Sequence, residues 1–294
     1  MIKIPILKID QFKESKPLDD FYINSFSNHI ELNKKLLDKP HSHNFYLCVL
    51  FTEGTGTHEI DFNSYSINPG KVFFLKPGQT HFWKFDSKPE GYIFFHSQEF
   101  YDIKFLGHTL NSFPFFYSNQ NPPLLELSQR KLSQLKLKFK EVYTEYQQQN
   151  ILRELKITTL INSIYIDLTR SYTADVDIEK LVSSNYSTLL EKLENLINNY
   201  FYIEKLPNFY ANQLHITTKH LNRVVRKTIN KTTSQLISER IILESKRLII
   251  HSENNLASIA ETLNFSDYAY FSRFFKSKTG DTPINFKKKY HSSK

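Results

Sequence analysis

The sequence holds a single cysteine and no long apolar run, and each of these features excludes some classes of protein. Cys48 has no second cysteine to pair with, which excludes an intramolecular disulfide and favours a reducing compartment. The first ten residues include Pro5 and Asp10, where a secretion signal needs an unbroken apolar stretch. No apolar run approaches the roughly 20 residues that cross a bilayer. We therefore expect a cytoplasmic protein with no membrane partner.

Acidic residues do not outnumber basic ones, and the excess of positive charge is confined to one end of the chain. From residue 186 onward there are 17 Lys and Arg against 9 Asp and Glu, whereas the preceding 185 residues hold 21 of each sign. The whole net charge of +8 therefore lies in the C-terminal third. This distribution indicates a polyanionic partner for that third. A solvated basic tail around Lys287, Lys288 and Lys289 is the alternative reading of the charge alone.

Residues 41–96 show the pattern of short strands. Aromatic-rich runs alternate with turn signals such as Gly54-Thr55-Gly56, Pro77-Gly78 and Pro89-Glu90-Gly91. Strands at this spacing predict a small barrel or sandwich. The runs are Asn44–Phe51, Lys71–Leu75, His81–Phe85 and Tyr92–His96.

After Pro122 and Pro123 the apolar period lengthens to that of helices. The two helices could pack on the strands, or their heptad spacing could pair two copies of the chain in a homodimer, and the spacing leaves both open. A polar stretch at 171–185 suits a linker, which gives domains at 1–170 and 186–294. The two apolar stripes are Leu132, Leu135, Phe139, Val142 and Tyr146, then Ile157, Leu160, Ile161, Ile164 and Leu168.

The C-terminal domain contains the pattern of a helix-turn-helix unit twice. In the first, a short helix with Ala211 at the crossing point precedes a helix from about Lys219 to Thr228, capped by Thr217 or Thr218. Leu221, Val224 and Val225 form its buried stripe. Four side chains share the opposite face, and Arg and Asn are the types that read guanine and adenine edges. These four are Lys219, Asn222, Arg223 and Arg226.

The second unit gives the stronger signal. An amphipathic helix, Leu256–Leu263, precedes a turn and a helix from about Tyr268 to Lys278, which Ser266 or Asp267 caps and Gly280 ends. Phe271, Phe274 and Phe275 are predicted to face inward. The segment Ser234–His251 between the units is a rod of about 27 Å. Such a rod can hold two reading helices about one duplex turn, roughly 34 Å, apart.

The C-terminal region resembles the DNA-binding domain of AraC/XylS-family transcription regulators. The resemblance covers about residues 186–291, and the family's usual glycines are replaced by Asn230 and Asn264, which also tolerate positive φ. It implies base contacts for Lys219, Asn222, Arg223, Tyr268, Tyr270 and Arg273, and phosphate contacts for Arg226, Lys227 and Lys276. The residues that carry it are Ile259-Ala260-Glu261, Asn264–Asp267, Tyr270–Lys276 and Gly280–Pro283.

The region from His41 to His96 is similar to a cupin-type sensor barrel. Pro40-His41-Ser42-His43 and Pro77–His81 carry the match, but the Glu that metal-dependent cupins place after the second His is missing. The histidines could bind Zn or Fe, form a metal-free ligand pocket, or fill a structural core. We favour the metal-free pocket, with no cofactor. Its predicted lining is His41, His43, Phe45, His81 and Trp83.

Together these features predict an α+β two-domain protein. A cupin-like β-barrel with flanking helices is followed by an all-α domain with two helix-turn-helix units joined by a long helix. The predicted function is a sequence-specific, ligand-responsive transcription regulator and not an enzyme, with activation favoured by the resemblance. Its expected partners are double-stranded DNA, a small-molecule effector, a second copy of the chain and, for an activator, RNA polymerase. The alternative is a metal-dependent cupin enzyme with an appended nucleic-acid-binding module.

Overall fold

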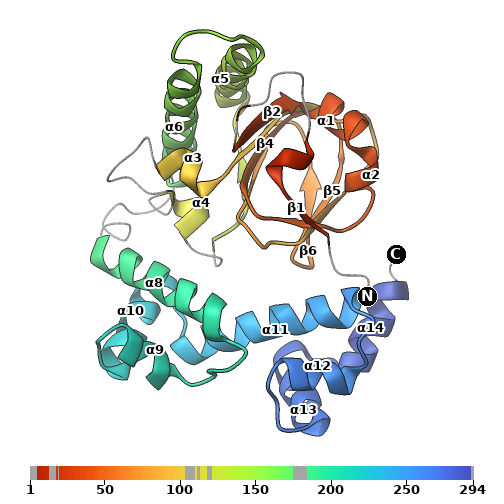
Figure 1. Ribbon diagram of the computed structural model, residues 1–294, viewed down its shortest axis with the longest axis vertical. Helices are drawn as coiled ribbons and strands as arrows, with labels where there is room; N and C mark the ends of the chain where they lie inside the picture. Colours follow the sequence, from red (N-terminus) through yellow and green to blue (C-terminus); the bar gives the residue numbers. More distant parts are fainter. Residues whose placement is uncertain are drawn as a thin grey trace. The chain divides into compact units, whose positions relative to one another are not determined.

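The protein folds as two compact units (Figure 1). The computed structural model describes residues 5–12, 18, 20–102, 110, 113–117, 121–174 and 184–292. One unit lies within residues 5–178 and the other within 179–294. Of the linker predicted at 171–185, Ser171 and Tyr172 end a helix and Ser184 begins the next, while 175–183 lie outside the described residues.

The N-terminal unit is built on a five-stranded and a three-stranded antiparallel sheet that enclose a common core. The larger has the order β10 (Leu124–Glu126), β7 (Lys71–Leu75), β4 (Tyr46–Glu53), β9 (Glu90–His96), β2 (Phe21–Ser25). The smaller has the order β6 (Asn63–Ile67), β5 (Gly56–Ile60), β8 (His81–Phe85). A short parallel pair joins β1 (Ile6–Leu7) to β3 (Ser42–His43). The short helices are η1 (Ile9–Gln11), α1 (Phe26–Leu32), α2 (Lys34–Leu37), α3 (Gln98–Asp102) and α4 (Pro114–Tyr117).

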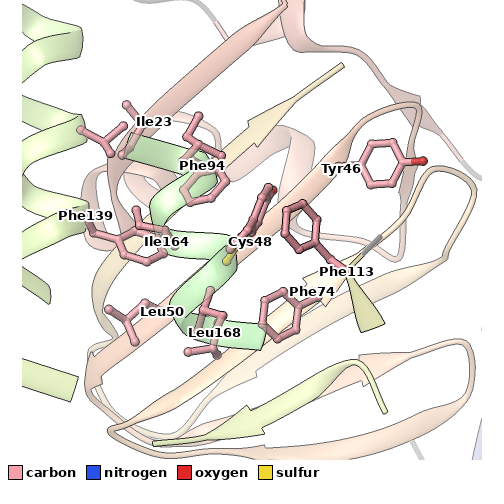
Figure 2. Packing of buried hydrophobic residues seen from close by; sticks show 14 of the residues in the cluster. Ile23, Tyr46, Cys48, Leu50, Phe74, Phe94, Phe113, Phe139, Ile164 and Leu168 are labelled. Atoms are coloured by element: carbon pink, nitrogen blue, oxygen red, sulfur yellow. The ribbon is translucent and has the colours of Figure 1, made fainter. Parts of the chain in front are cut away.

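Strand β4 is apolar without alternation because both of its faces are buried. Leu47, Val49 and Phe51 point into the core between the sheets. Cys48 and Leu50 point the other way, toward two long helices, α5 (Gln129–Gln147) and α6 (Arg153–Tyr172), as Figure 2 shows. The strand therefore belongs to two hydrophobic clusters at once.

Strand β9 passes β4 so closely that one position requires glycine. Gly91 has φ of 148°, and a Cβ there would lie 1.9 Å from the Leu50 carbonyl oxygen. The sequence suggested a turn at this position, whereas Gly91 pairs with Phe51 inside the sheet.

Helices α5 and α6 cover the outer face of the five-stranded sheet with their apolar stripes. All five residues of the apolar stripe predicted on α5 are buried in the hydrophobic cluster between the sheet and these helices. Of the five in the stripe on α6, only Leu160 is partly exposed. The stripes thus pack on the sheet, and the same residues are not available as a seam between two copies of the chain. Homodimer formation through these helices stays a prediction, but any seam has to use other residues.

The C-terminal unit is entirely helical, and its helix ends follow the predicted signals. Thr217 Oγ1 accepts from the His220 backbone N–H at 3.1 Å, and Asp267 Oδ1 accepts from that of Tyr270 at 2.7 Å. Asn230 and Asn264 have φ of 54° and 53°, which confirms the positive φ expected of them. The helices are α8 (Ser184–Tyr200), α9 (Pro207–Gln213), α10 (Thr218–Ile229), α11 (Thr233–His251), α12 (Leu256–Thr262), α13 (Tyr268–Thr279) and α14 (Pro283–Ser292).

Two helix pairs, α9–α10 and α12–α13, are joined by the long helix α11 (Figure 1). Ala211 and Ala260 are buried where the helices of each pair meet, because only a small side chain lets the backbones approach. Leu221, Val224 and Val225 form the buried stripe of α10, while in α13 Phe271 and Phe275 are buried and Phe274 is half-buried. The two helix-turn-helix units and the connecting rod are therefore as predicted.

Candidate functional site

Helix α10 presents a dense cationic surface. Lys219, Arg223, Arg226 and Lys227 are exposed, while Asn222 is half-buried. With Thr232 and Ser234 at the start of α11, these side chains line a groove of about 570 Å³. Four cations and two hydroxyl groups around one open groove suit a polyanion such as a nucleic-acid backbone.

Two side chains of this surface are already engaged within the domain. Asn222 Oδ1 accepts from the Thr233 backbone N–H at 3.0 Å, and its Nδ2 donates to the Thr218 carbonyl at 3.2 Å. It thereby satisfies one of the free amides at the start of α11. Arg223 donates from Nη2 to His220 Nδ1 at 2.9 Å, which directs its guanidinium along the helix. A bidentate contact of Asn222 with a base therefore has to compete with, or share the amide with, these two hydrogen bonds.

Helix α13 presents a smaller surface with more aromatic character. Arg273 and Lys276 are exposed, Tyr270 is 49% exposed and Tyr268 is half-buried. The Tyr270 ring lies 5.6 Å from that of Phe265, so this half-exposed side chain packs against the buried Phe265 on one side. At the start of the helix, hydrogen bonding to the Tyr270 backbone N–H lowers the pKa of Asp267, so the cap is charged near neutral pH.

The predicted sensor residues meet inside the N-terminal unit. His41 and His81 form a backbone pair, with N–H to O distances of 3.1 and 2.8 Å, and their rings lie 4.4 Å apart. Measured between ring centres, His43 lies 5.2 Å from His81 and stacks on Phe45 at 4.5 Å. The ring centre of Trp83 lies 4.6 Å from that of His81. The fold thus places His41 and His81, which are 40 positions apart in the chain, next to each other.

A fourth imidazole, His58 on β5, completes this histidine cluster, defined as His41, His43, His58 and His81. His58 Nε2 and His81 Nδ1 are 3.0 Å apart. His58 was not among the predicted pocket residues, although it occupies an alternating buried position between Gly56 and Ile60. That alternation, with the pairing of β5 to β8, is the signal that could have located it.

Hydrogen bonds on one side of the cluster fix which ring nitrogens carry protons. His41 Nδ1 and His43 Nδ1 donate to the carbonyls of Lys39 and Phe45, at 2.9 and 2.7 Å. Burial, reinforced by the neighbouring His41, lowers the pKa of His43 to about 3, so its ring is neutral near pH 7. Burial also lowers the pKa values of His58 and His81 well below 6.5.

Four buried polar atoms of this region have no hydrogen-bond partner within the ranges that the structure describes. They are His43 Nε2, His58 Nδ1, His81 Nε2 and Trp83 Nε1. An unsatisfied buried polar atom costs about 1–3 kcal/mol, and four in one place point to a binding site. Among the residues that the structure describes, no group of three or more His, Cys, Asp or Glu side chains is arranged to hold a metal ion.

Comparisons with known proteins agree with both units. Residues 37–160 match the family described as an AraC-like ligand binding domain, and residues 210–289 match a helix-turn-helix domain. The molecule is therefore a two-domain DNA-binding transcription regulator that carries a ligand-binding domain. Specifically, the chain belongs to the AraC family of transcription regulators.

Individual relatives cover nearly the whole chain at low identity. The HTH-type transcriptional activator RhaS of Escherichia coli O81 (strain ED1a) is 23% identical over 268 residues, which is 90% of this chain and 94% of RhaS. The structure of ToxT from Vibrio cholerae strain SCE256, solved with an unsaturated fatty acid, is 16% identical with a TM-score of 0.40 and covers 93% of this chain and 96% of ToxT. In the described part of the chain, no helix is long and apolar enough to cross a membrane.

Proposed function

We propose that this protein is a ligand-responsive activator that reads DNA through α10 and α13 in successive major grooves. The observation that carries the proposal is the pair of exposed cationic helices held on one rod, α11. Lys219, Arg223, Tyr268, Tyr270 and Arg273 are the proposed base contacts, and Asn222 joins them if its amide is released by the DNA. Arg226, Lys227 and Lys276 are the proposed phosphate contacts, because they lie exposed beside the base-reading positions.

The base-reading role is tested with Arg273→Ala and a matched variant that removes the same charge elsewhere. The target sequence is first selected from random DNA with the full chain. We expect Arg273→Ala to weaken specific binding by about 10-fold or more and random-sequence binding by much less. Lys278→Ala, an exposed lysine on the same helix, is the control for charge. An equal loss on specific and random DNA for Arg273→Ala would contradict the base contact.

We further propose that the histidine cluster binds an uncharged effector that carries both hydrogen-bond donors and acceptors. Trp83 Nε1 is a donor, and His43 Nε2 is an acceptor because its Nδ1 already donates. His58 and His81 share one hydrogen bond, so whichever ring donates, their two outer nitrogens supply one donor and one acceptor. Two donors and two acceptors match hydroxyl or amide groups better than a carboxylate or a metal ion.

This effector chemistry is tested with neutral monosaccharides, simple amides and the acids that correspond to the sugars. Trp83 is the only tryptophan and reports binding through its fluorescence. We expect a neutral compound to bind, and His43→Asn to weaken it by roughly 10-fold, because Asn keeps a donor for Phe45 but loses the Nε2 acceptor. Preference for the acids would refute the uncharged class. Stoichiometric Zn or Fe that is lost in His43→Ala would instead revive the metal-dependent enzyme.

A homodimer and a contact with RNA polymerase complete the proposed function. Leu137, Leu155 and Ile166 are 69%, 49% and 39% exposed on α5 and α6, which supplies apolar surface for a second copy of the chain. The similarity to RhaS, a transcriptional activator, supports activation as the direction of regulation. Sedimentation of the wild type and of Leu137→Glu tests the dimer, and transcription with purified polymerase tests activation. Because the target is DNA, we propose that the protein acts in the cytoplasm.

A further inference from the structure

Lysine 205 connects the two helix-turn-helix units at a point away from α11. It lies in the loop between α8 and α9, directly before the first unit. Its Nζ donates to the Asn264 backbone carbonyl, in the turn between α12 and α13. The same ammonium lies 4.1 Å from the centre of the Phe265 ring. One side chain thus joins residues that are 59 positions apart in the chain.

Both ends of this contact are held by further contacts within the C-terminal unit. On the loop side, the Tyr210 hydroxyl donates to the Glu204 carbonyl at 2.6 Å, and Phe201 is buried beneath the Arg240 guanidinium at 4.0 Å. On the other side, Phe265 is 7% exposed and contacts Phe271 and Phe274 of α13 at 5.2 and 5.3 Å. The ammonium therefore bridges two rigid segments.

Because Asn264 lies close to the start of α13, a bond to its carbonyl also restrains the position of that helix. Asn264 has φ of 53° in the turn, and α13 begins four residues later at Tyr268. A single helix such as α11 can bend gently and allow its two ends to roll relative to each other. A second attachment removes this freedom, because two bodies joined at two points hold their relative orientation. A cation over an aromatic ring, combined with a charge-assisted hydrogen bond, is strong enough for this purpose.

We propose that Lys205 is a positioning residue for DNA recognition, which sets the separation and orientation of α10 and α13. It touches no DNA itself in this scheme and acts through the Asn264 turn and Phe265. The inference rests on the proposed two-groove binding. It differs from that proposal because it concerns the spacing of the two half-sites and not the bases within either one.

The experiment measures binding of the full chain to a series of target duplexes whose half-site spacing is lengthened or shortened by one base pair. One base pair moves the second half-site by about 3.4 Å and rotates it about the duplex axis. We expect the wild type to lose about 10-fold or more in affinity at either altered spacing. We expect Lys205→Ala to bind the natural spacing about 5-fold more weakly and to vary less than about 3-fold across the series.

Three further variants distinguish the positioning role of Lys205 from a general effect of its charge and from a failure to fold. Lys192→Ala removes the same charge from an exposed site on α8 and should keep the wild-type spacing profile. Lys205→Arg keeps a donor and a cation and should restore the sharp profile. Lys205→Met keeps the packing on Phe265 but not the donor, and stands in for alanine if Lys205→Ala does not fold.

Different results would refute the positioning role of Lys205 and the two-groove DNA binding on which it rests. If Lys205→Ala and Lys205→Met keep the wild-type profile, or lose the same factor at every spacing as Lys192→Ala does, the positioning role is wrong. If the wild type itself shows no preference between its selected target and random DNA, the two-groove function is wrong, and the spacing series then has no sharp profile to lose.

Discussion

The buried histidines of the N-terminal unit should make its stability fall as the solution becomes mildly acidic. Burial, with a smaller effect of His41, lowers the pKa values of His29 and His43 from 6.5 to about 3, and burial lowers that of His96 to about 4. Because these values are depressed in the folded state, the unfolded chain takes up protons first. The stability is thus fully present above about pH 6.5 and is lost as the pH falls toward the folded values.

The size of the loss follows from the width of that window. Between pH 6.5 and its folded value, each group lowers the free energy of unfolding by about 1.4 kcal/mol per pH unit. From about pH 7.5 to about pH 5.5 the three histidines together lower it by about 4 kcal/mol. Domains are typically stable by about 5–15 kcal/mol, so the effect takes a large share of the total.

Urea unfolding at the two pH values, followed by tryptophan fluorescence, measures this loss. Trp83 is the only tryptophan and is 6% exposed, so its emission reports the N-terminal unit alone. The urea midpoint should be clearly lower at the acidic pH. His43→Asn should reduce the pH-dependent loss by about 1.4 kcal/mol, the share of one such histidine. Equal midpoints for the wild type at both pH values, or a higher one in acid, would refute the reasoning.

Three further outcomes are expected. Lys276→Ala should weaken specific and random DNA binding alike and reduce the slope of log affinity against log salt by about one, as a titration at several salt concentrations would show. Asn230→Ala should destabilise the C-terminal unit by about 1 kcal/mol while Asn230→Gly is neutral or stabilising, because φ of 54° disfavours a Cβ; thermal unfolding by circular dichroism measures both, and equal effects would argue against strain. Gly91→Ala should destabilise the N-terminal unit by about 3 kcal/mol in the urea assay, since the Leu50 carbonyl occupies the space, and an unchanged midpoint would contradict this close approach.

The features that were predictable from sequence depend on neighbours along the chain. The ends of α10 and α13 follow from Thr217, Asp267 and Gly280, because capping is decided within one helical turn. The positive φ of Asn230 follows in the same way. The convergence of His41 and His43 follows from their spacing of two on an extended segment, which directs both side chains to one side.

The features that escaped prediction depend on what lies across space. The heptad stripes of α5 and α6 have the same spacing whether a sheet or a second helix covers them, and only the fold shows that the sheet does. Asn222 has the sequence position of a base reader, but its Oδ1 meets the Thr233 amide because α11 starts beside it. The Lys205 contact with Asn264 joins positions that no periodicity connects.

The double burial of β4 has a consequence for how related chains can differ in length. Its odd-numbered residues from Leu47 to Phe51 face the histidine side, and its even-numbered residues face α5 and α6. Inserting or deleting one residue within the strand would exchange these two sets, because side chains alternate between the faces. We therefore expect changes in chain length outside β4, for example in the turn at Gly78, where an added Cβ meets nothing within 4 Å, while β4 itself varies by substitutions that preserve volume on both sides.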